Sequence, residues 1–168
     1  TREVISSFQS QSDEADYVAG LLHDVGKIVM ASAFPEHFTE VYRQHHETRR
    51  DLLAVERTVL GIDHAELGAL YLEQHHLPEV LIQAARFHHE PERSSHHTPI
   101  VAAVQIADLL CRQAGIGDSG NHTPLGENQW EEASGWNLLF SRQSDTEKSI
   151  ARANLQRSLE RLPTILEG

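Results

Sequence analysis

Hydrophobic residues recur along this chain at the three- and four-residue spacing of amphipathic helices. The first long run covers residues 13–33 and follows an acidic first turn. Its regularly spaced apolar residues are Tyr17, Val18, Leu21, Leu22, Val25, Ile28 and Val29. This periodicity predicts one continuous helix over residues 13–33. A shorter apolar face of Val4, Ile5 and Phe8 predicts the end of an earlier helix within residues 1–11.

Residues that start and stop helices divide the next part of the chain. A proline opens residues 35–46 and suits the first turn of a helix there, and Gly61 is positioned to end a helix over residues 50–60. We expect these two helices to have a structural role only and to contribute no residue to a functional site. Asp63 suits the N-cap of the following helix, and Glu66, three residues later, predicts a capping box.

The same signals continue toward the C-terminus. Residues 79–89 form the next predicted helix, which follows Leu77-Pro78 and is stopped by Pro91. Thr98-Pro99 then supplies a cap and a first-turn proline for a helix that reaches about Cys111.

The last third of the chain begins with a segment of different composition. Residues 115–128 are rich in Gly, Asn, Ser and Pro and predict a surface loop. Two further helices are predicted over residues 130–140 and 146–166.

These patterns predict an all-α fold, because no strand pattern or internal repeat stands out. The 168 residues suffice for one compact domain with its own core, and its apolar residues are mainly Ala, Leu, Ile and Val. We expect a bundle of about seven or eight helices in a single domain. Residues 1–115 would form its main part, and residues 116–168 would complete it. Because it opens partway through an element, we expect the chain to be truncated at its N-terminus.

Charge and cysteine content narrow the classes of function. The net charge of −11 makes the molecule repel phosphate backbones and anionic lipids, so we expect neither nucleic-acid nor membrane binding. Cys111 is the only cysteine, which rules out an intrachain disulfide and suits a small core side chain. No leader or long apolar run is present in this sequence, and a cytoplasmic location is expected.

Twelve histidines are an unusual number for a chain of this length, and eight of them occur as four adjacent pairs. We expect at most one of these pairs to be functional. The histidines without a nearby carboxylate in the predicted fold are not expected to bind metal; they are His37, His45, His46, His75, His76, His96, His97 and His122.

The adjacent pair His23 and Asp24 is the first candidate for chemistry. Neighbouring residues on a helix point about 100 degrees apart, so ordinary packing cannot bury both side chains, whereas one small cation beside the helix can bind both. Gly26 would permit a close approach of backbone or ligand. Lys27, within one turn, is placed to meet an anionic oxygen, and a phosphate is the natural candidate.

Asp108 is an independent candidate, because it lies on the same stripe as Val104 and Cys111. A carboxylate buried on such a stripe is costly unless it binds a metal or a structural partner such as an arginine, and both readings remain open. His64 at a helix start and the pair His88-His89 at a helix end would add imidazoles. A mixed set of nitrogen and oxygen donors suits zinc, iron or manganese.

Taken together, this order of residues resembles the HD superfamily of metal-dependent phosphohydrolases, and more closely its HDOD subgroup from bacterial signalling. The resemblance covers about residues 13–115. The segments that carry it are Gly20-Leu21-Leu22-His23-Asp24-Val25-Gly26-Lys27, Gly61-Ile62-Asp63-His64-Ala65-Glu66-Leu67-Gly68, Leu77-Pro78, His88-His89-Glu90-Pro91 and Ala107-Asp108.

The resemblance implies a helical bundle of the HD type around one or two divalent metals, which could be iron, manganese, zinc or magnesium. It implies that His23, Asp24 and Asp108 hold the principal metal. It also implies that His64, His88 and His89 are ligands of a second metal. Asp24 and Lys27 would be the catalytic residues of an active relative, with Lys27 contacting the substrate phosphate.

Two features depart from the pattern of the active relatives. No histidine precedes His23, although superfamily members usually supply one from the preceding helix. The Gly-Tyr-Pro signature of cyclic-dinucleotide-cleaving relatives is also missing after His88-His89, so hydrolysis of cyclic-di-GMP is not expected.

Three functions therefore remain open. The first is a regulatory module that binds other signalling domains or proteins. The second is a phosphohydrolase that acts on a nucleotide or another phosphate ester. The third is a structural or sensor domain stabilised by a metal.

Overall fold

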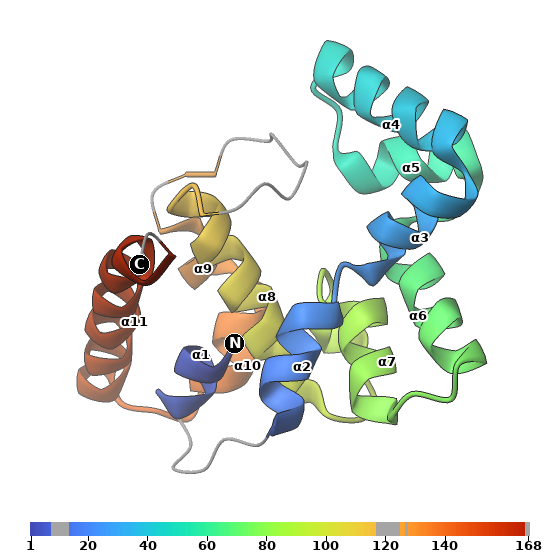
Figure 1. The fold of residues 1–168 in the computed structure, drawn as a ribbon. Helices are drawn as coiled ribbons and strands as arrows, with labels where there is room; N and C mark the ends of the chain where they lie inside the picture. The colour runs from blue at the N-terminus through green and yellow to red at the C-terminus, as the bar shows by residue number, and fades with distance from the viewer. Residues whose placement is uncertain (8–13, 117–124, 127, 167–168) are drawn as a thin grey trace.

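The computed structural model describes residues 1–7, 14–116, 125–126 and 128–166, with side chains described as far as residue 161. These residues form eleven α-helices and one 3-10 turn, and no strand (Figure 1). The predicted all-α class is confirmed. The elements are α1 Arg2–Ser6, α2 Glu14–Leu22, α3 Val25–Ala33, α4 Pro35–Thr48, α5 Leu52–Leu60, α6 His64–Gln74, α7 Glu79–Phe87, η1 Pro91–Arg93, α8 Thr98–Gln113, α9 Gln129–Glu132, α10 Ser134–Phe140 and α11 Asp145–Leu166.

The prediction of one helix over residues 13–33 is wrong, because the chain breaks into α2 and α3 at His23 and Asp24. Asp24 has φ −98° and ψ 13°, a sparsely populated backbone region outside the helical range. The break directs the start of α3 against α6. A Cβ atom at Gly26 would lie 1.8 Å from the carbonyl oxygen of His64, so only glycine permits this approach.

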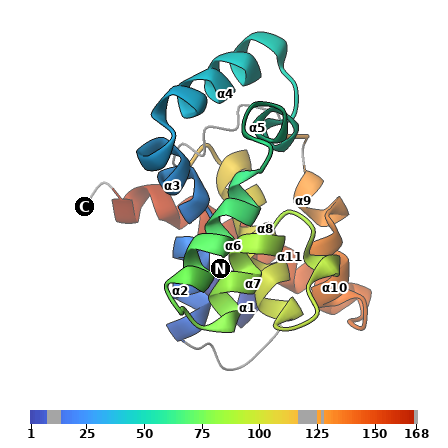
Figure 2. The ribbon, with the colours of Figure 1, turned by 90° about the vertical axis from the view of Figure 1, so that its right-hand side faces the viewer.

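Helices α4 and α5 form a hairpin that projects away from the other helices (Figures 1 and 2). Pro35 occupies the first turn of α4 as predicted, and Gly61 ends α5 with a φ of 80°. Asp51 caps α5 by accepting a hydrogen bond from the Ala54 amide. The hairpin rests on α3 through a small core of Met30, Val41, Leu52 and Val55.

Helix α6 begins at the cap that the sequence predicts, but only half of the predicted capping box forms. Asp63 accepts a hydrogen bond from the Glu66 amide at 2.9 Å. The carboxylate of Glu66 instead pairs with Arg86 of α7 at 3.1 Å. This ion pair joins α6 to α7, and both helices pack with α2 in a second core.

Helix α8 connects this second core to the third one. Val104 packs with α2, α6 and α7, whereas Ile106 and Leu110 pack with α1 and the C-terminal helices. The third core contains two tryptophans, Trp130 and Trp136.

The helix predicted over residues 130–140 is in fact two helices, because Ala133 is extended between α9 and α10. Most of the loop predicted for residues 115–128 lies outside the described residues. None of the described helices has the length and apolar character needed to cross a membrane.

Substitution of Gly26 by alanine tests the close approach of α3 to α6. We expect the free energy of unfolding to fall by about 2 kcal/mol or more, because backbone atoms on both sides must separate. Gly126→Ala is the control, since its Cβ would meet only Gln129 Oε1 at 3.9 Å. Chemical denaturation measures both variants, and a Gly26→Ala variant as stable as the control would contradict this packing.

Candidate metal centre

The seven site residues predicted from the sequence come from four segments, and three of these segments lie where helices begin or end. His23 and Asp24 lie at the break between α2 and α3, and Lys27 follows in the first turn of α3. The imidazoles come from the first residue of α6 and from the two residues after α7, and Asp108 comes from the middle of α8.

Asp24 is at the centre of this group. Its Oδ1 atom lies 3.2 Å from His64 Nε2 and 3.6 Å from His88 Nε2. Its Oδ2 atom lies 2.6 Å from Lys27 Nζ and 3.6 Å from His23 Nε2. One carboxylate therefore faces three imidazoles and one ammonium group.

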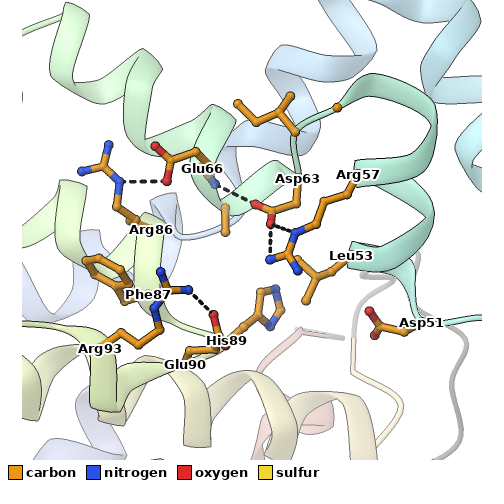
Figure 3. A pocket seen from close by; sticks show the side chains of 13 residues that line it. Asp51, Leu53, Arg57, Asp63, Glu66, Arg86, Phe87, His89, Glu90 and Arg93 are labelled. Carbon is orange, nitrogen blue, oxygen red and sulfur yellow. Dashed lines mark hydrogen bonds and ion pairs between the residues drawn. The ribbon is translucent and has the colours of Figure 1, made fainter.

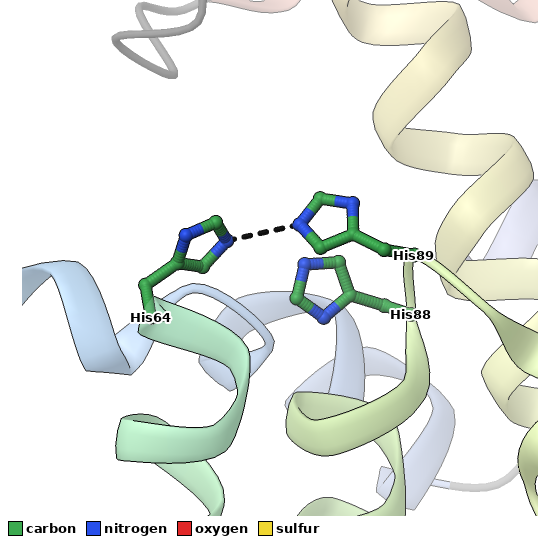
Figure 4. Close-up of side chains that lie close together, drawn as sticks. All are labelled: His64, His88 and His89. Carbon is green, nitrogen blue, oxygen red and sulfur yellow. Dashed lines mark hydrogen bonds between the residues drawn. The ribbon is translucent and has the colours of Figure 1, made fainter. Parts of the chain in front are cut away.

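The ligand atoms form two groups, and within each they lie no more than 4.8 Å apart. One group is His64, His88 and His89, in which the Nε2 atoms of His64 and His89 are 3.0 Å apart (Figure 4). The other group is His23, Asp24 and His88. His88 therefore belongs to both groups, whereas the resemblance assigned it to the second metal alone.

Asp108 lies at the edge of this arrangement. Its Oδ1 atom is 3.9 Å from His23 Nε2, and its Oδ2 atom is 3.9 Å from Arg112 Nη1. Burial raises the pKa of Asp108, and the nearby Asp24 carboxylate adds to this effect. The sequence left two interpretations of Asp108, a metal ligand or a carboxylate paired with an arginine. The structure is compatible with both, because the carboxylate faces a candidate ligand on one side and an arginine on the other.

Hydrogen bonds on the far side of the rings orient two of the imidazoles. His23 Nδ1 lies 2.8 Å from the carbonyl oxygen of Gly20, and His88 Nδ1 lies 2.9 Å from that of Ala85. A carbonyl oxygen can only accept, so each Nδ1 carries the proton. In a neutral ring the Nε2 atom then presents its lone pair to the centre, which is the form that binds a metal.

His64 is oriented by Glu56, a residue that the sequence analysis did not single out. The Glu56 carboxylate is fully buried and accepts from both His64 Nδ1, at 2.7 Å, and the His64 amide, at 2.9 Å. The helix that contains it, α5, was expected to contribute nothing to a functional site. This expectation is wrong, because Glu56 holds a candidate ligand in place. The available signal was the position of Glu56 on the buried stripe with Leu52 and Val55.

Several buried polar atoms at the centre have no hydrogen-bond partner among the described residues. They include His23 Nε2, Asp24 Oδ1 and His88 Nε2. Buried polar groups in proteins are nearly always hydrogen-bonded, so this concentration in one place needs an explanation. A divalent cation bound between them would provide one, because it accepts lone pairs from both imidazole nitrogen and carboxylate oxygen.

The protonation states suit such a cation. Burial, together with repulsion from His64, lowers the pKa of His89 to about 3. Burial also lowers the pKa of His88 well below its ordinary value. Burial alone would raise the pKa of Asp24, but the His64 imidazole and the charges of His23 and Lys27 outweigh it and lower the pKa strongly. The rings of His88 and His89 are thus favoured in the neutral form and the Asp24 carboxylate in the ionised form.

His64 is the exception. Burial opposes the charged ring, but the nearby carboxylates of Asp24 and Glu56 raise its pKa. A metal can bind His64 only after the ring releases its Nε2 proton.

The other described histidines lie outside both groups of ligand atoms. His45 is one of them. It is buried, and its Nδ1 lies 2.7 Å from the carbonyl oxygen of Arg50. It therefore has a structural role where α4 turns toward α5. His122 lies outside the described residues.

Three cavities among the described residues include residues of the centre. One of about 420 Å³ includes His89 in its wall, and three arginines border it (Figure 3). Each arginine is paired with a carboxylate, in the pairs Arg57–Asp63, Arg86–Glu66 and Arg93–Glu90. A second cavity, of about 660 Å³, includes Asp24 and Lys27 and is otherwise mainly apolar. A third, of about 410 Å³, includes His23, Asp24 and Asp108.

Comparison with known proteins identifies relatives of this chain. The family model described as the HDOD domain matches residues 1–91. A solved HDOD domain protein of unknown function from Geobacter sulfurreducens is similar, with a TM-score of 0.72 and 26% identity; the match covers 86% of this chain and 50% of that one. An uncharacterized protein of Treponema pallidum (strain Nichols) is 31% identical over 97 residues, which are 57% of this chain and 19% of that protein. The chain therefore corresponds to only part of each relative.

Substitution of Glu56 by glutamine tests its support of His64. Oε2 of Glu56 accepts from both His64 donors, and Oε1 also lies 2.9 Å from His64 Nδ1. An amide that keeps its oxygen at the Oε2 position sets its NH₂ group against the Nδ1–H donor, so we expect a loss of about 1 to 3 kcal/mol in the free energy of unfolding. The measurement is chemical denaturation with a chelator present, which separates this effect from metal binding. Glu66→Gln is the control, because its more exposed ion pair with Arg86 should cost less than about 1 kcal/mol. Equal losses in the two variants would contradict a special role of Glu56.

Proposed function

The chain belongs to the HDOD domain family, and we propose that it is a bacterial signal-transduction module whose core binds one or two divalent cations. The observation that carries this proposal is the convergence of His23 Nε2, Asp24 Oδ1 and His88 Nε2, all buried without a hydrogen-bond partner among the described residues. The module would act by binding other signalling domains or proteins.

The donor set favours some metals over others. It combines imidazole nitrogens with the carboxylate of Asp24, and such mixed donors suit iron, manganese or zinc. Magnesium prefers oxygen ligands and retains its water, so an imidazole-rich centre suits it less. His88 belongs to both groups of ligand atoms, and its Nε2 atom can bind the ion of only one group at a time. The number of bound ions therefore depends on which group includes His88.

The position of Lys27 favours a second candidate function, metal-dependent hydrolysis of a phosphate ester. Lys27 and Asp24 form part of the wall of the cavity of about 660 Å³, and Lys27 Nζ lies 2.6 Å from Asp24 Oδ2. Lys27 could turn from this carboxylate to a phosphate oxygen of a ligand in the cavity. A bound cation would supply the positive charge that phosphoryl transfer requires.

Elemental analysis of the purified chain tests the metal centre. We expect about one or two divalent ions per chain, and loss of them in an Asp24→Ala, Asp108→Ala double variant, because both carboxylates face the imidazoles. The control is a His75→Ala, His76→Ala variant, which removes two exposed imidazoles outside both groups of ligand atoms. A chain without metal, or one whose metal is lost from the control instead, would contradict the proposal.

An activity screen separates the two functions. The regulatory proposal predicts that the metal-loaded chain is inert toward mononucleotides, cyclic nucleotides and generic phosphodiesters. Turnover that depends on the metal and falls at least about a hundredfold in Lys27→Gln would instead establish the hydrolase, since that variant removes the ammonium group but keeps the carboxylate of Asp24. Arg43→Gln is the control, because this arginine is exposed and, in the described part of the chain, pairs only with carboxylates of its own helix.

A further inference from the structure

We propose that Gln105 is a positioning residue that links the His89 side of the centre to the C-terminal helices. The proposal rests on the metal centre for its functional meaning. Gln105 lies on α8, and its side-chain amide bridges two backbone segments. Its Nε2 atom donates to the carbonyl oxygen of His89 at 2.8 Å, and its Oε1 atom accepts from the Gly135 amide at 2.8 Å.

His89 needs such support more than the other imidazoles. His23 and His88 are anchored through Nδ1 to backbone carbonyls, and His64 is anchored to Glu56. Among the described residues, no hydrogen bond fixes Nδ1 of His89. Within the part of the chain that the structure describes, the only hydrogen bond of the ring is at its far end, where Nε2 lies 3.0 Å from His64 Nε2. Its position therefore depends on its backbone, which follows the end of α7 and is held by Gln105.

The other end of the bridge is equally constrained. A Cβ atom at Gly135 would lie 2.7 Å from Gln105 Oε1 and 2.8 Å from the carbonyl oxygen of Ala102, so α10 begins in close contact with α8. The amide cannot reverse, because its NH₂ group would then face the Gly135 N–H and its oxygen would face the His89 carbonyl. Only a side chain with one donor end and one acceptor end satisfies both partners.

This bridge couples two regions that are far apart in sequence. A shift of α10 relative to α8 moves the acceptor end of Gln105, and the donor end transmits the change to the backbone of His89. By linkage, a cation that binds the His64, His88 and His89 group must in turn favour one position of α10. The C-terminal helices are thus the part of the chain through which metal occupancy would be sensed.

Cobalt(II) titration of the full chain tests this role. We expect Gln105→Leu to weaken the binding of one ion by about 10- to 100-fold, the usual effect of removing support behind a ligand. Gln83→Leu is the matched control. Gln83 is a buried glutamine that also tethers a nearby loop, by accepting from Ser94 Oγ at 3.0 Å, but among the described residues it makes no hydrogen bond to a candidate ligand. Unchanged affinity in Gln105→Leu, or an equal loss in both variants, would overturn the proposal.

Gln105→Glu covers the case in which the leucine variant does not fold. A carboxylate still accepts from the Gly135 amide but cannot donate to the His89 carbonyl. The loss of cobalt(II) affinity should therefore persist although the contact with α10 remains. Affinity equal to that of the unmodified chain would overturn the proposal.

Nitrogen-15 NMR of the imidazole rings, recorded with a chelator present, tests the same role without metal. We expect Gln105→Glu to shift the ring signals of His89 and His64 and to leave those of His23 in place, whereas Gln83→Leu shifts none of them. If the unmodified chain takes up no cobalt(II), the metal centre fails, but this measurement still decides the role of Gln105. Unchanged His89 signals in Gln105→Glu would overturn it.

Discussion

The convergence of imidazole nitrogen atoms on the single half-buried carboxylate of Asp24 is the constraint on which this structure depends. Oriented nitrogen atoms that all present electron pairs to one small volume repel one another unless positive charge lies between them. Lys27 supplies one positive charge, but it lies at Oδ2 of Asp24 and leaves Oδ1 to the histidines. The carboxylates of Asp24 and Glu56, acting against burial, raise the pKa of His64 and so favour a second positive charge between them. A divalent cation would supply the positive charge instead, and it would bind the imidazole nitrogen and carboxylate oxygen atoms directly.

The architecture brings helix ends, rather than helix middles, to this point. The break before α3, the start of α6 and the end of α7 meet there, and residues at helix ends can take backbone conformations that a continuous helix forbids. Gly26 and Gly68 bring α3 and α6 into backbone contact, which moves Asp24 close to His64. Asp108 is the one candidate from within a helix, and it lies at the edge of the group.

The sequence predicts the helices better than it predicts the centre. Periodicity and capping signals locate most elements, because Pro35, Gly61 and Asp63 act locally. The break at His23 is not predicted, since the apolar spacing continues through it and the cause is a contact with distant α6. Glu56 was missed although it lies on a buried stripe, because its partner His64 is in another helix. The six candidate ligands were grouped into one site by their resemblance to the family motifs, and periodicity alone does not predict that grouping.

The most direct test of the cation centre is anomalous diffraction at the absorption edge of the metal, from a crystal of the metal-loaded chain. We expect a peak about 2.0 to 2.3 Å from His88 Nε2 and at a similar distance from an oxygen of Asp24. A second peak beside His64 and His89 is compatible with this centre. Anomalous density confined to the exposed histidines, with His23, Asp24 and His88 still unpartnered, would contradict the presence of a cation there.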